Sequence, residues 1–375
     1  MRETVSFGRL AGIRVGANWS VLIIGWILAF GLAAGVLPEA APGHATGLYW
    51  VAGLLATAVF LGSLLAHEMA HALVARAKGL PVEGITLWAL GGVSKLGGDA
   101  SRARDELRIA IAGPATSLVL GVAFFATAAG LAALGAGDLV VTTVVWLATI
   151  NVVLGLFNLA PAFPLDGGRV VRALLWARHG DRLQATRSAA AVGRAFGFGL
   201  VGLGVMVVFL GAVFQGVWFM LLGWFVVSMG QAEATGVEQR RLLEDVTVDE
   251  VMSAPVACVP ADLTVDRLVD EHVLTHRWSA YPVVDDDDRL LGLATLDTVR
   301  RVPAEERSST RVLDAGFPAA EVPQAPPGAS LADQLATLSA SPVGRLVVVD
   351  QGRVVGLVSR TDVVSCLQRR SLMSS

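Results

Sequence analysis

Long apolar stretches alternate with short polar segments over the first 235 residues of the chain. About 20 consecutive apolar residues are enough for a helix to cross the hydrocarbon core of a bilayer. The pattern therefore predicts six membrane-spanning helices in this part of the chain. Their expected ranges are about 19–37, 46–73, 107–134, 139–159, 195–213 and 216–232.

The segment 82–98 lies between the second and third of these spans and has a different pattern. It is short and rich in glycine, with apolar residues at Val82, Ile85 and Leu87. This favours a membrane-associated β-hairpin or a re-entrant segment. Non-helical backbone at membrane depth is stable only where protein covers it or where it lines a water-filled cavity.

After Gln239 the pattern changes to short strands and helices, and a repeat appears. Gly292-Leu-Ala-Thr295 matches Gly356-Leu-Val-Ser359 at an offset of 64 residues. A repeat of this length, with strand–turn–strand–helix content, predicts a pair of small α/β domains. We therefore expect a polytopic α-helical membrane protein, with six transmembrane helices plus the β-hairpin, and a C-terminal cytosolic α/β pair. The expected domains are 1–235, 244–303 and 308–372.

Composition supports a membrane protein with a soluble appendage. Hydrophobic residues make up 54% of the chain and charged residues 16%, whereas soluble domains carry about 25% charged residues. Both cysteines, Cys258 and Cys366, lie in the polar tail. Two cysteines over that length do not form a disulfide framework, which fits a reducing cytosol.

Lysine and arginine are unevenly distributed between the segments that connect the spans. The N-terminal segment, residues 75–108, residues 169–194 and the tail hold nearly all of them, whereas 38–46, 132–138 and 212–216 hold none. Basic residues concentrate in cytoplasmic loops. The distribution predicts a multi-pass protein of the cell membrane with both termini in the cytoplasm and a basic cytoplasmic loop at 169–194.

A cleaved signal peptide is the alternative interpretation of the first apolar stretch. The stretch is long for the apolar region of a signal peptide, and the six-span topology requires that it be retained. We therefore expect it to remain as the first span.

The second span contains His67, Glu68 and His71 within the sequence Leu-Leu-Ala-His-Glu-Met-Ala-His-Ala-Leu. On a helix the two histidines lie one turn apart on the same face. Two imidazoles arranged in this way can bind one metal ion, and the adjacent glutamate can act on a metal-bound water. The alternative is a chance motif on a surface helix. Because ionisable groups inside a span are costly, the location favours a metal site.

The fourth span ends in Asn158-Leu-Ala-Pro-Ala-Phe-Pro-Leu-Asp166-Gly-Gly-Arg. The prolines stop the helix, and the predicted topology brings Asp166 to a depth similar to that of the two histidines. A catalytic zinc ion has three protein ligands and one open position, and Asp166 is the best candidate for the third ligand. Its alternative role is a helix cap or a loop carboxylate. Asn158 can donate to a substrate carbonyl or its oxyanion, or it can stabilise the broken helix.

These two motifs together resemble the paired signature of the site-2 protease family, which are zinc-dependent intramembrane metalloproteases. The resemblance covers about 1–235, including the glycine-rich segment and Ala112-Gly-Pro114. It implies that His67, His71 and Asp166 are the zinc ligands and that Glu68 is the catalytic base. One departure is Asn18, where many members have a histidine. No stretch is similar to the PDZ domain that some members contain.

The repeat in the tail resembles tandem CBS domains. In that family a hydroxyl residue, followed three positions later by aspartate, commonly holds the ribose and phosphate of an adenine nucleotide. Ser359 and Asp362 match this pattern, whereas Thr295 is followed by Thr298. The resemblance implies one competent nucleotide site or none, and the alternative is a purely structural pair. The acidic run 285–288 is expected to be a solvated turn.

The preferred interpretation is an intramembrane zinc endopeptidase modulated by a CBS pair that can bind ATP or another adenine nucleotide. The resemblance implies regulated proteolysis of a single-span membrane protein, such as an anti-sigma factor or a pro-protein. The bilayer is an expected partner, a homodimer through the CBS pair is open, and nucleic acid is not expected. The alternatives are a CBS-regulated transporter or channel and a catalytically silent membrane sensor. The intact set of metal-binding residues disfavours both, since a pore has no need of Glu68 between two histidines.

Overall fold

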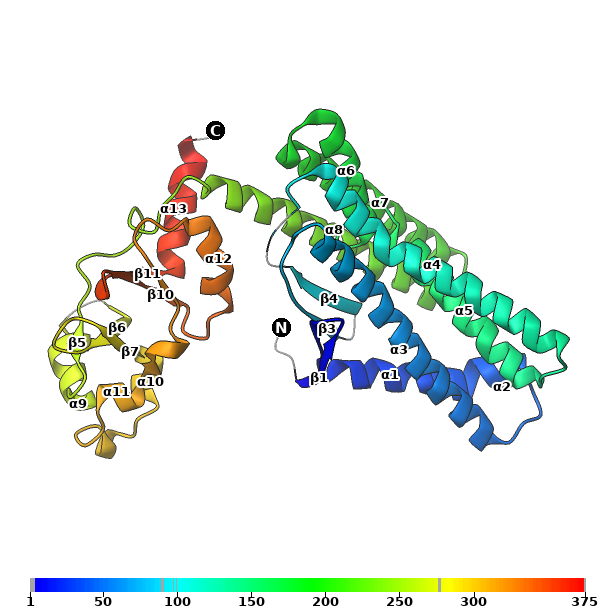
Figure 1. Cartoon of the computed structure of the whole chain (residues 1–375), viewed down its shortest axis with the longest axis horizontal. Helices are drawn as coiled ribbons and strands as arrows, with labels where there is room; N and C mark the ends of the chain where they lie inside the picture. Colours follow the sequence, from blue (N-terminus) through cyan, green and yellow to red (C-terminus); the bar gives the residue numbers. More distant parts are fainter. Residues whose placement is uncertain (1–3, 89–90, 97, 99, 276–277, 374–375) are drawn as a thin grey trace. The chain divides into compact units, whose positions relative to one another are not determined.

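The computed structural model describes residues 4–88, 91–96, 98, 100–275 and 278–373. The chain divides into two compact units, Met1–Thr235 and Gly236–Ser375, and Figure 1 shows the elements of each. The first unit is mainly helical, and the second is built from short strands and helices.

Six helices of the described chain are long and apolar enough to cross a membrane. Large apolar side chains such as Leu22, Trp26 and Phe209 are exposed on them, as expected of helices surrounded by lipid. This confirms the polytopic helical fold. The first span consists of α1 (Ser20–Gly31), a π-helical turn (Leu32–Val36) and α2 (Leu37–Ala40), and the other five are α3 (Thr46–Ala77), α4 (Ala103–Ala133), α5 (Asp138–Asn158), α7 (Arg182–Phe209) and α8 (Val213–Leu242).

The basic loop predicted at 169–194 is wrong, because the segment is helical. It consists of most of α6 (Asp166–His179) and the first turns of α7. α6 ends at Gly180, whose φ of 77° is left-handed, a conformation that glycine adopts without steric cost. Asp181 then caps α7 by accepting hydrogen bonds from two backbone N–H groups of the first turn.

The predicted hairpin at 82–98 is part of a larger sheet. β3 (Val82–Trp88) pairs with β4 (Gly91–Leu96) in antiparallel register, and residues 89, 90 and 97 lie outside the described part of the chain. The sequence did not predict a second hairpin, β1 (Val5–Leu10) and β2 (Ile13–Ala17), whose second strand pairs in parallel with β3. The strand order is β1-β2-β3-β4.

The buried face of this sheet packs on the helix that carries the histidine motif. Ile13 and Val15 of β2 and Ile85 of β3 are at most 3% exposed. They form one apolar cluster with Met69 and Ala72 of α3. Burial of these side chains against α3 favours a fixed position for the sheet beside the motif, because buried apolar surface stabilises the contact.

The second unit contains two sheets that follow the sequence repeat. β5-β6-β7-β8 form the first sheet and β11-β10-β9 the second. The strands are β5 (Val259–Pro260), β6 (Ala280–Val284), β7 (Leu290–Thr295), β8 (Phe317–Pro318), β9 (Gln324–Ala325), β10 (Arg345–Asp350) and β11 (Arg353–Ser359). The helices are α9 (Val265–Arg267), α10 (Leu296–Arg300), α11 (Val312–Ala315), α12 (Leu331–Ala340) and α13 (Arg360–Met373), with a π-helical turn at Leu268–Val273 and 3-10 turns at Ala304–Glu306 and Ala319–Glu321.

The two repeats are equivalent and pack on one another. The hairpins β6–β7 and β10–β11 occupy the same place in each repeat, and each repeat has its own apolar core. A third cluster joins them through Leu293 of the first repeat and Val347 and Leu357 of the second. α8 continues to Leu242, so the charged residues 238–242 that precede the repeats are helical.

Candidate metal centre

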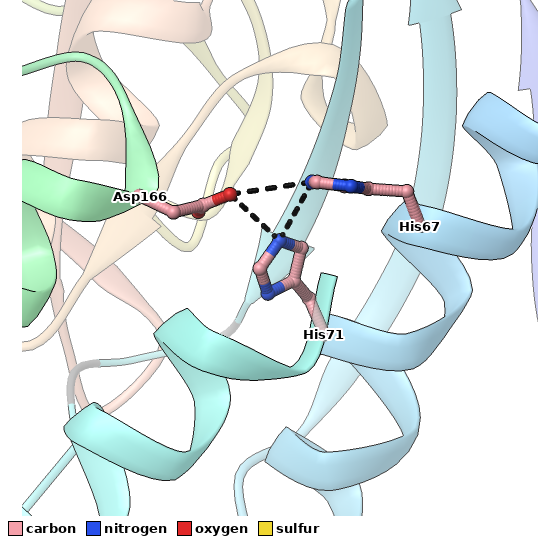
Figure 2. Close-up of side chains that lie close together, drawn as sticks. All are labelled: His67, His71 and Asp166. Carbon is pink, nitrogen blue, oxygen red and sulfur yellow. Dashed lines mark hydrogen bonds and ion pairs between the residues drawn. The ribbon is translucent and has the colours of Figure 1, made fainter. Parts of the chain in front are cut away.

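Three side chains from two helices converge in the first unit. His67 and His71 project from α3, and Asp166 is the first residue of α6 (Figure 2). Asp166 Oδ2 lies 3.2 Å from His67 Nε2 and 3.1 Å from His71 Nε2, and the two Nε2 atoms are 3.2 Å apart. Both histidines are at most 5% exposed. The structure therefore brings together the three residues that the sequence proposed as ligands.

The spacing of these three atoms suits a tetrahedral zinc site. Zinc binds imidazole nitrogen and carboxylate oxygen at about 2.0–2.2 Å, and tetrahedral geometry then places neighbouring ligand atoms about 3.3 Å apart. The observed separations of 3.1–3.2 Å are close to this value. Three ligands leave a fourth position open for water, which is the arrangement of catalytic zinc sites.

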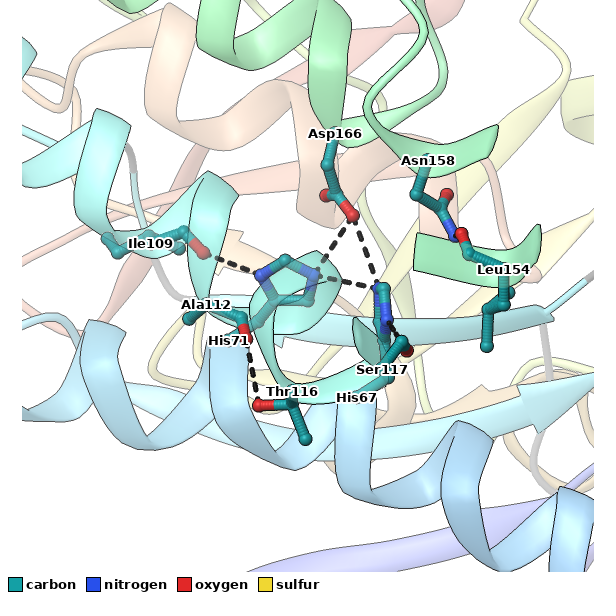
Figure 3. Close-up of polar contacts among 9 residues, drawn as sticks. All are labelled: His67, His71, Ile109, Ala112, Thr116, Ser117, Leu154, Asn158 and Asp166. Atoms are coloured by element: carbon teal, nitrogen blue, oxygen red, sulfur yellow. Dashed lines mark hydrogen bonds and ion pairs between the residues drawn. The ribbon is translucent and has the colours of Figure 1, made fainter. Parts of the chain in front are cut away.

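The other ring nitrogen of each histidine is bonded to α4 (Figure 3). His71 Nδ1 lies 2.6 Å from the backbone oxygen of Ile109, and His67 Nδ1 lies 2.9 Å from Ser117 Oγ. A backbone carbonyl only accepts hydrogen bonds, so Nδ1 of His71 donates. When Ser117 accepts from His67 in the same way, both Nε2 atoms present lone pairs toward Asp166. Outer partners of this kind set the tautomer and orientation of metal-binding histidines.

Gly113 lies between these two contacts on α4 and brings the helix backbone close to the rings. A Cβ atom at position 113 would collide with the Nε2 atoms of both histidines. Ile109, Gly113 and Ser117 are spaced by four residues, so they share one face of the helix. Sequence reasoning missed Ile109 and Ser117. The available signal was the spacing of small residues within a span, which is typical of close helix contacts.

The loop after α5 places Asp166 beside the histidines. It folds back on the start of α6 so tightly that a Cβ at Gly167 would collide with the backbone of Leu159 and Ala160. A Cβ at Gly168 would collide with the backbone of Ala162 and Phe163. The two glycines after Asp166 are therefore required for the close approach of the loop and the helix.

Glu68 is half-buried beside the sheet. A Cβ at Gly92 of β4 would collide with the Glu68 side chain, so β4 and this carboxylate are direct neighbours. Asn158 is also half-buried, and its amide nitrogen donates to the backbone oxygen of Leu154 at 3.0 Å (Figure 3). This bond corresponds to the helix-stabilising role of Asn158, and its role toward a substrate stays a prediction.

In the second unit, Ser359 and Asp362 are bonded to each other. Ser359 Oγ donates to Asp362 Oδ2 at 2.6 Å, and the backbone N–H of Asp362 lies 3.2 Å from Ser359 Oγ. Thr295 and Thr298 form the equivalent capping box at the start of α10. The hydroxyl pattern of both repeats therefore caps a helix.

A cleft of about 270 Å³ lies at the Thr295–Thr298 cap of the first repeat. Thr295 lines it, whereas Ser359 and Asp362 are not among its lining residues. Its polar lining comes from both repeats and consists of Ser279, Thr295, Asp297, Thr298, Arg300, Arg301 and Arg345. The structure thus places Thr295 at a recess, whereas Ser359 and Asp362, the better sequence match, lie outside its lining.

Comparison with known proteins gives two families. The family model "Peptidase family M50" matches residues 55–138 and 131–201, and the model "CBS domain" matches residues 248–305 and 315–369. "Putative zinc metalloprotease Rip3" of Mycobacterium tuberculosis is 42% identical over 366 residues, covering 97% of this chain and 92% of the relative. "Putative zinc metalloprotease sll0528" of Synechocystis is 28% identical, with 98% and 96% covered. "Zinc metalloprotease MJ0392" of Methanocaldococcus jannaschii is 27% identical, with 81% and 82% covered.

These matches agree with the architecture of six apolar helices followed by a repeated α/β tail. The chain belongs to peptidase family M50, the site-2 protease family, and is a multi-pass membrane zinc metalloprotease that carries a tandem pair of CBS domains.

Proposed function

We propose that His67, His71 and Asp166 hold the catalytic zinc ion. The observation that carries the proposal is the convergence of three donor atoms, 3.1–3.2 Å apart, from helices that are distant in sequence. A zinc ion held there would supply Lewis acidity, which polarises the substrate carbonyl and activates water. The buried position of the two imidazoles keeps competing water away from the ligands.

Glu68 is the proposed proton carrier. It follows His67 on α3, is half-buried and lies against Gly92 of β4. As general base it takes the proton of the attacking water, and as general acid it passes that proton to the amine nitrogen of the leaving peptide. Asn158 is the proposed donor to the substrate carbonyl, through whichever amide hydrogen is not used by Leu154.

The substrate is proposed to be a membrane-embedded segment of a single-span protein, of the anti-sigma factor or pro-protein type. A helix hides its peptide bonds, so the segment must be locally extended before cleavage. β4 is the last strand of the sheet, and no other described strand pairs with its outer edge. An extended segment can add to such an edge through backbone hydrogen bonds. Because Gly92 of β4 lies against Glu68, the added segment would be held beside the proposed base.

We further propose that the CBS pair controls the protease by binding adenine nucleotide, in the cleft at Thr295. Three arginines, Arg300, Arg301 and Arg345, line the cleft and suit phosphate groups, which guanidinium binds in a bidentate manner. The volume of about 270 Å³ is near the lower end for small-molecule sites. Both termini are proposed to lie in the cytoplasm, where nucleotide is available, and a homodimer through the CBS pair is also proposed.

Metal analysis of the full-length protein tests the central proposal. Protein purified without chelator is expected to hold about one zinc ion per chain, and Asp166→Ala is expected to lose most of it. Asp181→Ala is a matched control, because the Asp181 side chain accepts its hydrogen bonds from the first turn of α7. Wild-type protein without zinc, or Asp166→Ala with a full zinc content, would overturn the assignment.

A further inference from the structure

A buried arginine lies on the same helix as the proposed Asp166 ligand and is not part of the ligand set. Arg172 is on α6, six residues after Asp166, and its side chain is 4% exposed. Its Nε and Nη2 atoms lie 2.7 and 2.5 Å from Glu106 Oε1 on α4. Its Nη1 atom lies 2.8 Å from Glu233 Oε1 on α8. We call these three residues the arginine clamp.

The clamp also contacts the loop that leads to the proposed Asp166 ligand. The Arg172 guanidinium also lies over the ring of Phe163, 5.3 Å from its centroid, in the loop that leads to Asp166. Glu106 is on the same helix as Ile109 and Ser117, the hydrogen-bond partners of the two histidines. One guanidinium therefore sets the position of α6 and its preceding loop relative to the helix that orients the imidazoles.

The two carboxylates of the clamp differ in exposure. The Glu106 side chain is 2% exposed, and its second oxygen has no hydrogen-bond partner among the described residues. It therefore depends on Arg172 for compensation of its charge. The Glu233 side chain is 41% exposed, so its contact can be broken at a lower cost in solvation. Burial lowers the pKa of Arg172, but the two glutamates outweigh this and raise the pKa above its usual value, so the guanidinium stays charged.

A buried ion pair is a poor way to gain stability, because desolvation offsets most of the attraction. Apolar side chains of similar size would hold three helices together as well. An ionic contact differs from an apolar one in that its geometry is directional. In this clamp the contact with the exposed Glu233 can also be broken. That end is on α8, which runs from Val213 to Leu242 and so extends past Gly236, the first residue of the second unit.

We propose that Arg172 is a positioning residue for the Asp166 ligand. Its ion pair with Glu233 determines how tightly Arg172 holds the loop that carries Asp166. The proposal rests on the proposed function, in that Asp166 must be a zinc ligand. A shift of α8 that withdraws Glu233 would leave Arg172 with Glu106 alone and loosen the loop that carries Asp166. The last membrane helix thus gains control over the affinity of the site for zinc.

The test measures zinc release from full-length protein in lipid nanodiscs to a chromogenic chelator. Loss of a partner bonded directly to a ligand typically weakens metal binding about 10–100-fold. Arg172 acts on Asp166 through α6 and its preceding loop, so Arg172→Gln is expected to release zinc several-fold to about 10-fold faster, at the lower end of that range. Arg172→Lys keeps the charge without the fork and is expected to be intermediate, and Glu233→Ala is expected to show a smaller increase. The matched controls are Arg178→Gln, exposed on the same helix, and Glu244→Ala, exposed beyond the end of α8, which should release zinc as the wild type does.

Two further measurements separate positioning from a general structural role. The absorption spectrum of the cobalt-substituted protein should change in Arg172→Lys and Glu233→Ala, because the ligand geometry changes, and it should not change in the controls. Glu233→Ala should add nothing in an Arg172→Gln background, since Glu233 acts through Arg172. If Arg172→Gln does not fold, the lysine and Glu233 variants carry the test.

The outcomes distinguish the inference from the proposed function. A wild-type protein that holds zinc, together with clamp variants that release it at the wild-type rate with unchanged cobalt spectra, would overturn the inference alone. A wild-type protein that holds no zinc would overturn the assignment of Asp166 itself.

Discussion

At the scale of single residues, the two ring nitrogens of each imidazole have separate roles. The Nδ1 atoms of His67 and His71 are engaged by α4, and the Nε2 atoms face Asp166. The two rings are thereby held in position, so binding of zinc at the proposed site would need little reorganisation. Orientation of ligands in this way is what allows a buried site to bind metal tightly.

Glu68→Gln is expected to retain zinc and to lose proteolysis. Glutamine preserves the shape of the side chain but cannot accept the proton of water, and removal of a general base typically lowers the rate about 10²–10⁴-fold. Cleavage of a membrane-embedded substrate in proteoliposomes, with zinc content measured on the same sample, checks both parts. Glu83→Gln, an exposed position on β3, is the control, and wild-type cleavage by Glu68→Gln would rule out its role as base.

Ser117→Ala is expected to weaken zinc binding about 10–100-fold, because His67 loses the partner that orients it. Thr116→Ala is the matched control, since the Thr116 hydroxyl donates to Ala112 in the preceding turn (Figure 3). Competition with a chelator of known affinity provides the measurement. Equal zinc affinity of the two variants would show that the Ser117 contact does not orient the ligand.

At the scale of secondary-structure elements, α4 is the support of the site. It contributes the hydrogen-bond partners of both histidines, the Glu106 end of the clamp and, at Gly113, the space in which the rings lie. A side chain at Gly113 would collide with both imidazole rings, and the rings cannot move away because they are attached to α3.

Gly113→Ala is therefore expected to abolish zinc binding although alanine favours helices by about 1 kcal/mol over glycine. Gly130→Ala, on the same helix with nothing within 4 Å of the added atom, is the matched control and is expected to be neutral or slightly stabilising. Zinc content and thermal unfolding of both variants are the measurements. Full zinc content in Gly113→Ala would show that α4 does not lie against the rings.

At the scale of the whole molecule, a membrane protease is joined to a CBS pair by a helix that belongs to both units. Residues up to Thr235 are counted with the first unit, yet α8 continues to Leu242. Coupling between two sites is reciprocal and is typically about 1–3 kcal/mol. If nucleotide alters zinc retention, zinc must alter nucleotide affinity by the same factor.

Arg345→Ala is expected to weaken the binding of ATP, ADP or AMP to the full-length protein by about 1.5–3 kcal/mol, the usual value of a charge-assisted hydrogen bond. Asp362→Ala should have a smaller effect, because Asp362 is occupied with Ser359 outside the cleft. Calorimetry with each nucleotide is the measurement. Absence of heat at millimolar nucleotide would leave the pair as a docking or dimerisation module, and a larger effect of Asp362→Ala would return the site to the second repeat.

Much of the architecture of this protein can be predicted from short-range patterns in its sequence. The six spans, the 82–98 hairpin and the repeat in the tail were predictable because apolar length and periodicity are local properties of the chain. The pairing of His67 with His71 was predictable for the same reason, since both lie on one helix. Asp166 was predictable from the helix-breaking prolines and glycines around it, which bring a carboxylate to the end of a span.

The tertiary structure decided which faces meet, and pattern does not contain that information. Ser117, Ile109 and Gly113 acquire their importance only because α4 packs against the histidine face of α3. The first hairpin joins the sheet by parallel pairing with a strand about 70 residues away, and Arg172 selects Glu106 and Glu233 from helices on either side of it in sequence. The sequence by itself determined the spans, the repeat and the candidate metal ligands, because these depend on neighbours along the chain. Their orientation, support and regulation depend on neighbours in space, and only the packed structure supplied those.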